Sequence, residues 1–212
     1  MRRFGIVLAA SALLVLTVVA PVSAGQTTYN SSGSALTAQG GWNSFDAATG
    51  TSDYGWVTGW QAQGDPALVQ FSGGSREVIV CTQARGNQAA TTSYLETVRY
   101  GSGPGSLSVG LKYFVASASG TIDISSSTYN GCTGEFTSSF ASGVAVTLEL
   151  TGWGDLVMQK GTGSFKIPGE YNNHSRYSST YRPATGTASL GGEYHGVTGS
   201  IGKVSWNNHS NG

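Results

Sequence analysis

Two segments of the chain place an apolar residue at nearly every second position. One runs from Leu107 to Val115 and the other from Val144 to Leu150, with mostly small or polar residues between the apolar ones. Successive side chains of an extended strand point to opposite faces, so a period of two gives one buried face and one solvated face. The pattern predicts antiparallel β-structure with one wet side.

The composition favours strands in the rest of the chain as well. The 212 residues include 32 glycines, about twice the average share of about 7%, and Ser, Thr and Tyr are abundant. These residue types favour strands and turns over helices. The further strand candidates are Glu77–Thr82, Tyr94–Tyr100, Thr121–Ile124, Leu156–Gln159, Ser164–Ile167, Ser175–Arg182 and Ile201–Trp206.

Glycine-rich and proline-containing signals lie between these candidates and indicate tight turns. Ten or so short strands at this spacing predict an all-β fold in a single domain. Two architectures remain open, an antiparallel β-sandwich of jelly-roll type and a small closed β-barrel. The turn signals are Gly73-Gly74, 101–105, Asn130-Gly131, Pro168-Gly169 and Gly191-Gly192.

The first 24 residues have the parts of a secretory signal peptide. Arg2 and Arg3 supply positive charge, Ile6–Ala20 is almost entirely apolar, and small residues lead up to Ala24. We expect cleavage after Ala24 and a protein that is secreted, either extracellular or associated with the cell envelope.

The part that follows the signal peptide is long enough for one domain and nearly neutral. Removal of 24 of the 212 residues leaves 188, with nine basic and eleven acidic side chains. Residues 25–50 are poorer in apolar side chains, which predicts an irregular or extended N-terminal arm before an antiparallel β domain at 51–212. The charge balance argues against a nucleic-acid partner, and we expect no transmembrane span in the mature chain.

Cys81 and Cys132 are the only cysteines. In an exported chain two cysteines pair by default, so a disulfide is predicted between them. The chain-entropy model gives about 4 kcal/mol for a loop of this length. Cys81 follows the apolar residues Val78, Ile79 and Val80, where a free thiol would be inert.

No set of residues has the spacing of a metal or cofactor site. His174, His195 and His209 lack the separations that zinc ligands require. Glu193 and His195 are two apart and would share one strand face, which is more typical of a solvated polar face than of a metal site. We expect neither a metal nor a cofactor.

Carboxylate side chains are the candidates for catalytic residues in this sequence. A glycoside hydrolase needs two of them across a cleft, and the strand candidates carry Glu77, Glu96, Glu149 and Glu193. Glu96 is the most interesting of these, because it shares its expected face with Tyr94 and Tyr100. The bland interpretation, that these glutamates decorate wet faces, carries more weight.

Aromatic side chains offer a binding site instead. Tyr54, Trp56 and Trp60 fall at even spacing, so a strand at 54–61 would project all three from one side, and Trp42 is a candidate to join them. Flat aromatic faces suit sugar rings, whose C–H groups are attracted to the negative π-face. The competing interpretation is that these tryptophans fill the core.

Three hypotheses about function follow. The first is a non-enzymatic extracellular protein that binds a glycan or other envelope ligand through Tyr54, Trp56, Trp60 and Trp42. The second is a secreted carbohydrate-active hydrolase that uses two glutamates. The third is a structural protein of the cell surface or matrix. Low charge and the lack of nucleophile and metal motifs favour the first and third over an enzyme.

Overall fold

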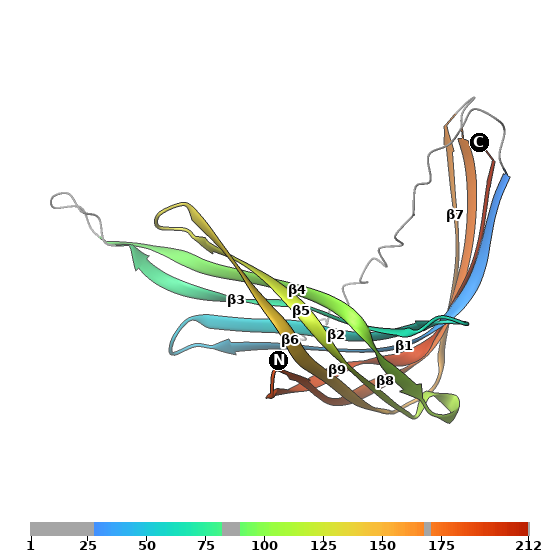
Figure 1. The fold of residues 1–212 in the computed structure, drawn as a ribbon, viewed down its shortest axis with the longest axis horizontal. Coiled ribbons are helices and arrows are strands. Elements are labelled where there is room, and N and C mark those ends of the chain that lie inside the picture. Colours follow the sequence, from blue (N-terminus) through green and yellow to red (C-terminus); the bar gives the residue numbers. More distant parts are fainter. Residues whose placement is uncertain (1–27, 82–89, 168–170, 212) are drawn as a thin grey trace, which may run out of the picture.

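The computed structural model describes residues 28–81, 90–167 and 171–211. The predicted signal peptide lies outside the described residues. Nine antiparallel strands form a single hydrogen-bonded sheet, which confirms the all-β prediction (Figure 1). The strands are β1 (Thr28–Asp46), β2 (Thr51–Ala62), β3 (Ala67–Cys81), β4 (Thr91–Val109), β5 (Val115–Asn130), β6 (Glu135–Gly152), β7 (Val157–Ile167), β8 (Tyr171–Leu190) and β9 (Glu193–Asn211).

The pairings form a closed circuit of eight strands. The sheet order is β6-β5-β4-β3-β2-β1-β9-β8-β7, and β6 pairs a second time with β8. This second pairing joins Val146–Gly152 of β6 to Ala184–Leu190 of β8. Strand β7 pairs with the first half of β8 and stays outside the circuit. The strands therefore do not form the two separate sheets of a β-sandwich. They form one sheet, which the β6–β8 pairing closes.

The long strands continue past the circuit in two directions (Figure 1). One extension holds the end of β3 with the first halves of β4 and β6 and the last part of β5; we call it the disulfide arm. The other, the terminal arm, holds β7 with the first halves of β1 and β8 and the end of β9.

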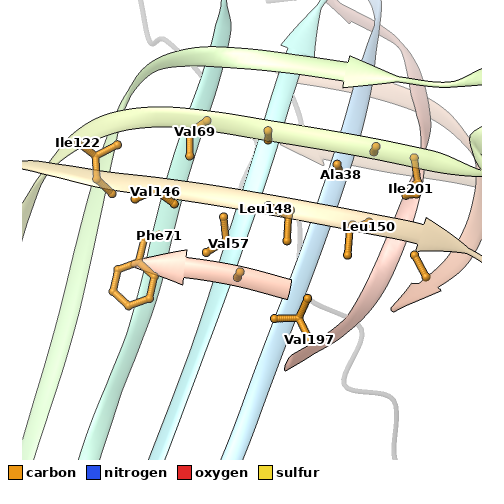
Figure 2. Packing of buried hydrophobic residues seen from close by; sticks show 14 of the residues in the cluster. Ala38, Val57, Val69, Phe71, Ile122, Val146, Leu148, Leu150, Val197 and Ile201 are labelled. Atoms are coloured by element: carbon orange, nitrogen blue, oxygen red, sulfur yellow. The ribbon is translucent and has the colours of Figure 1, made fainter. Parts of the chain in front are cut away.

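The hydrophobic core lies inside the circuit. Its side chains come from alternate positions of the paired strands and point toward one another (Figure 2). The interior is narrow: a Cβ on Gly59 would lie 2.6 Å from Cβ of Ala118. The largest fully buried side chains are Phe71, Ile122, Leu148, Ile201, Val57, Val69 and Val146. Throughout, the inner face is the side of the sheet that carries this cluster, and the outer face is the opposite side.

The strands are longer than the sequence predicted. Each has 11 to 20 residues, because two expected turns, at Gly73-Gly74 and at 101–105, lie inside β3 and β4. A Cβ on Gly74 would lie 2.1 Å from the carbonyl oxygen of Thr97, and one on Gly101 would lie 2.3 Å from that of Asp123. Glycine at these positions allows neighbouring backbones to approach closely rather than turning the chain.

The expected continuous strand from Leu107 to Val115 is wrong. β4 ends at Val109, a short 3₁₀ turn follows at Leu111–Tyr113, and β5 begins at Val115. Lys112 and Tyr113 have positive φ angles of 51° and 61°, which ends the extended conformation. The alternating pattern of apolar residues therefore extends beyond the strand into the turn. Leu111, which the pattern places on the buried face, is 91% exposed there.

Buried Arg182 holds this turn against the end of the circuit. Its Nε donates to the carbonyl oxygen of Lys112 at 3.0 Å, and its Nη1 donates to that of Gly154. The guanidinium carbon also lies 3.9 Å from the ring centre of Phe114. Two hydrogen bonds and a cation–π contact from one side chain thus join the 3₁₀ turn to the loop after β6.

Residues 25–50 differ from the irregular or extended arm that was expected. Most of the segment is β1, which pairs with β2 on one side and β9 on the other. Its core positions hold Ala38 and Gly40 rather than large apolar residues. The interior is so narrow that the core positions of this strand hold small residues. Because large apolar residues are missing there, the sequence of this segment did not indicate a core strand.

Cys81 and Cys132 form the predicted disulfide. Their Cα atoms are 5.3 Å apart, and the bond links the end of β3 to the turn between β5 and β6. Among the described residues, no helix is long and apolar enough to cross a membrane.

Candidate functional site

Tyr54, Trp56 and Trp60 lie on the outer face of β2. The alternate residues Gly55, Val57 and Gly59 are buried on the inner face, so the even positions point away from the core. Tyr54 is 39% exposed, and both tryptophans are half-buried. The structure therefore brings these three predicted site residues together on a face that the core does not use.

A tryptophan from the other end of the chain extends this group. The ring centres of Trp60 and Trp206 are 6.1 Å apart, and the ring planes differ by 25°. Trp206 belongs to β9, and β1 runs between the two tryptophan-bearing strands. Ala35 of β1 lies between them and is only 2% exposed, although it faces outward. The two indoles thus make a broad flat surface over a small residue.

Tyr100 of β4 lies on the same face beside Trp56. The register pairs Trp56 with Ser72 and Ser72 with Tyr100. The amide nitrogen of Gln70 donates to the Tyr100 hydroxyl at 3.0 Å. We call Tyr54, Trp56, Trp60, Tyr100 and Trp206 the outer aromatic band.

Glycines on neighbouring strands support the rings of the band. The register places Trp56 opposite Gly41 and Trp206 opposite Gly33. A Cβ on Gly41 would lie 2.0 Å from the Trp56 ring, and one on Gly33 would lie 2.5 Å from the Trp206 ring. Each indole therefore lies flat across a glycine backbone, which fixes its orientation on the sheet.

Trp42 lies on the opposite face and does not join the band. It pairs with Gly55 at an inner position, and its Nε1 donates to Oδ2 of Asp53 at 2.7 Å. Its ring stacks on His195 with centres 4.0 Å apart. The side chain closes one side of the core rather than presenting a free ring.

The turn between β1 and β2 sets which residues meet across these strands. The carboxylate of Asp46 accepts a hydrogen bond from the Ala48 amide at 2.9 Å and one from the Thr49 hydroxyl at 3.0 Å. These bonds lower the pKa of Asp46 below its ordinary value of 3.8, with the Ala48 amide the larger cause. The closed turn pairs Asp46 with Thr51 and so brings Gly41 opposite Trp56.

The surface between the rings is polar but uncharged. Thr58 lies between Trp56 and Trp60, and Ser72 lies between Trp56 and Tyr100, with Gln70 beside them. Hydroxyl and amide groups donate and accept hydrogen bonds without imposing a charge on the ligand. Two hollows of the described surface lie elsewhere, beside the disulfide and beside Glu149. No residue of the band lines either of these two hollows.

The carboxylates considered for catalysis are not paired across strands. Glu96 lies on the outer face between Arg76 and Tyr129. Glu149 lies between Ser117 of β5 and Thr187 of β8. Neither has another carboxylate as its direct cross-strand neighbour.

The histidines show no cluster of metal ligands. Nε2 of His195 lies 3.8 Å from Oε1 of Glu193. The His195 side chain is largely covered by Trp42 on the inner face, whereas Glu193 is exposed to solvent. His174 and His209 are direct cross-strand neighbours in the terminal arm. Over the described ranges, no group of three or more His, Cys, Asp or Glu residues could hold a metal ion.

Comparison with known proteins identifies no relative of this chain. No protein-family model matches it. No curated protein and no solved structure is significantly similar to it. The outer aromatic band is therefore interpreted from its own geometry.

Proposed function

We propose that the protein is a secreted, non-enzymatic binding protein that holds a glycan or other cell-envelope ligand on the outer aromatic band. The observation that carries this proposal is the stacked pair of Trp60 and Trp206. Trp56 lies on the same outer face, four positions before Trp60 on β2. Trp56 and Trp60 are half-buried on a face of β2 that carries no part of the core. A ligand surface gives them a role.

The physical fit to a sugar chain rests on ring faces and neutral hydrogen-bonding groups. Carbohydrate C–H groups are attracted to the negative face of an indole. Trp56 and Trp60 are four positions apart on one strand, or about 13 Å at the usual rise. This separation suits an extended ligand of several rings. Thr58 lies between them, where its hydroxyl can pair with a sugar hydroxyl.

Secretion supports the same proposal. The N-terminal segment has the pattern of a signal peptide, and the disulfide suits an oxidising compartment. A protein in such a place meets glycans and envelope polymers. Hydrolysis is not proposed, because it needs two carboxylates across a groove and neither Glu96 nor Glu149 faces another.

Tryptophan fluorescence tests the proposal. The oxidised protein from Gly25 onward is titrated with chitin, cellulose and xylan oligosaccharides and with soluble peptidoglycan fragments. We expect a saturable shift in emission with at least one of them. Replacing Trp56→Ala or Trp60→Ala should abolish the response, because each removes a ring from the band.

The matched control is Trp153→Ala. Trp153 is 58% exposed but lies in the connection between β6 and β7, outside the band. This variant should bind as the unchanged protein does, with circular dichroism confirming that all variants are folded. Equal loss of binding in the Trp153 variant, or no response to any of these glycans, would contradict the glycan proposal.

A further inference from the structure

One edge of the sheet is left open on β6. Residues Glu135–Ala141 pair with β5, but the pairing of β6 with β8 starts only at Val146. Within the described part of the chain, no strand pairs with the other side of this segment. Its residues are all exposed, and the segment forms a margin of the disulfide arm.

A β-bulge lies where this open edge begins. Between the pairs Ile122–Val144 and Ile124–Ala141, β6 has one residue more than β5. Gly143 has a φ of 67°, and its amide donates to Oδ1 of Asp123 at 2.9 Å. Bulges of this kind bend a strand and increase its twist. β8 ends at Leu190, opposite Val146, and the chain turns at Gly191-Gly192 into β9, so β8 has no residues left to pair with the first half of β6.

Two other margins of the sheet carry features that discourage pairing with another chain, whereas the margin of β3 at 77–81 is open as well and has Glu77 as its one charged residue. β7 has Lys160 and Lys166 on its inner face and two glycines between them. The margin of β1 in the terminal arm is built of Asn, Ser and Gly at 30–33, which are poor strand formers. Proteins protect exposed edges with lysines, prolines and bulges. Residues Phe136–Ala141 contain no charge, proline or glycine.

The open segment is also symmetric in sequence. Phe136, Thr137, Ser138, Ser139 and Phe140 follow one another, so the residues on either side of Ser138 match in type. An antiparallel pair of such segments centred on Ser138 would place each Phe136 opposite a Phe140 of the other copy. It would place Thr137 opposite Ser139. In a two-fold interface each such contact occurs twice, so the aromatic pair and the hydroxyl pair would each form on both sides of the axis.

We propose that a second copy of this chain pairs antiparallel with the β6 edge, with Ser138 on the two-fold axis. Phe136 and Phe140 are 75% and 66% exposed on the outer face, and Phe136 already contacts Tyr129 with ring centres 4.7 Å apart. Pairing would cover both phenylalanines with cross-strand aromatic partners. The two disulfide arms would join in one continuous sheet, with both outer faces on the same side.

Charges placed on the axis test the interface and its register. Sedimentation velocity of the oxidised protein from Gly25 onward should show dimers whose fraction rises with concentration. Ser138→Lys and Ser138→Glu each put like charges directly opposite one another, so each should raise the dimer dissociation constant about tenfold or more. An equimolar mixture of the two variants should recover the dimer, because opposite charges then meet on the axis.

The matched control is Ser127→Lys. Ser127 is the β5 residue directly opposite Ser138 and lies on the same face, but it is one strand from the edge. This variant should dimerise like the unchanged protein. A monomer at all concentrations, dimers unaffected by Ser138→Lys, or a mixture that stays monomeric would overturn the proposal. Because the glycan titrations use different residues, the failure of either proposal is distinguishable from that of the other.

Discussion

At the scale of the residue, the aromatic side chains and the glycines of this protein work in pairs across strands. Gly41-Trp42 on β1 and Gly55-Trp56 on β2 meet so that each glycine lies opposite the tryptophan of the other strand. One indole then lies on the outer face and one on the inner face. The glycine before each tryptophan thus leaves room for the ring of the neighbouring strand.

Filling one of these glycine positions should disturb the band without removing a ring. In a Gly33→Ala variant, the new methyl group would lie 2.5 Å from the Trp206 ring, so the indole must move out of its stack with Trp60. We expect a change in the near-ultraviolet circular dichroism of the tryptophans and weaker glycan binding.

Gly196→Ala is the control for that change. A Cβ at Gly196 would have no neighbour within 4 Å, and its backbone is not in the left-handed region. Spectrum and affinity should both stay as in the unchanged protein. Identical spectra for the Gly33 and Gly196 variants would contradict the described packing of Trp206 on Gly33.

At the scale of the element, alternation predicted which residues share a strand face but not where strands end. The segment from Val144 to Leu150 is confirmed as part of β6, with Val146, Leu148 and Leu150 buried. Glycine signals could not separate turns from close contacts inside strands, since glycine serves both purposes. Gly191-Gly192 does turn, with φ angles of 60° and 92°, whereas Gly73-Gly74 lies inside β3.

The disulfide should stabilise the arm without shaping the aromatic band. It closes a loop of 51 residues at the far end of β3. A Cys81→Ser, Cys132→Ser double variant should lose about 4 kcal/mol of unfolding free energy in urea titrations. Glycan affinity should be unchanged, because no band residue contacts the bond. Loss of binding in the folded double variant would show that the arm and the band are coupled.

At the scale of the whole molecule, the closed circuit concentrates the core in one short section of very long strands. The β6–β8 pairing is the step that closes it, and Leu148, which is fully buried, faces the core there. Sequence reasoning left sandwich and barrel open, because alternation is the same in both. Which strands pair is decided by contacts between residues far apart in the chain.

Truncating that leucine tests the closure. Leu148→Ala should lower the unfolding free energy by about 2 to 5 kcal/mol, through lost burial and a remaining cavity. Leu111→Ala is the control, because Leu111 is 91% exposed in the 3₁₀ turn and should change stability little. Equal effects in denaturant titrations would place Leu148 outside the core.

The same limit explains what the sequence missed in the candidate site. Parity along one strand correctly grouped Tyr54, Trp56 and Trp60 on one face. Whether Trp42 shares that face depends on the register between β1 and β2, which the turn at Asp46 sets. Trp206 enters only because β9 pairs with β1, and no local pattern in the sequence indicates that pairing.

The central claim is that the ligand binds on the outer aromatic band, and the indole N–H resonances of the five tryptophans test it directly. A ¹H–¹⁵N spectrum is recorded while the oxidised protein is titrated with the oligosaccharide that gives the largest fluorescence response. The signals of Trp56, Trp60 and Trp206 should shift together and saturate, while those of Trp42 and Trp153 should stay in place. Shifts confined to Trp42 or Trp153, or saturated binding with no shift in the band, would contradict the claim.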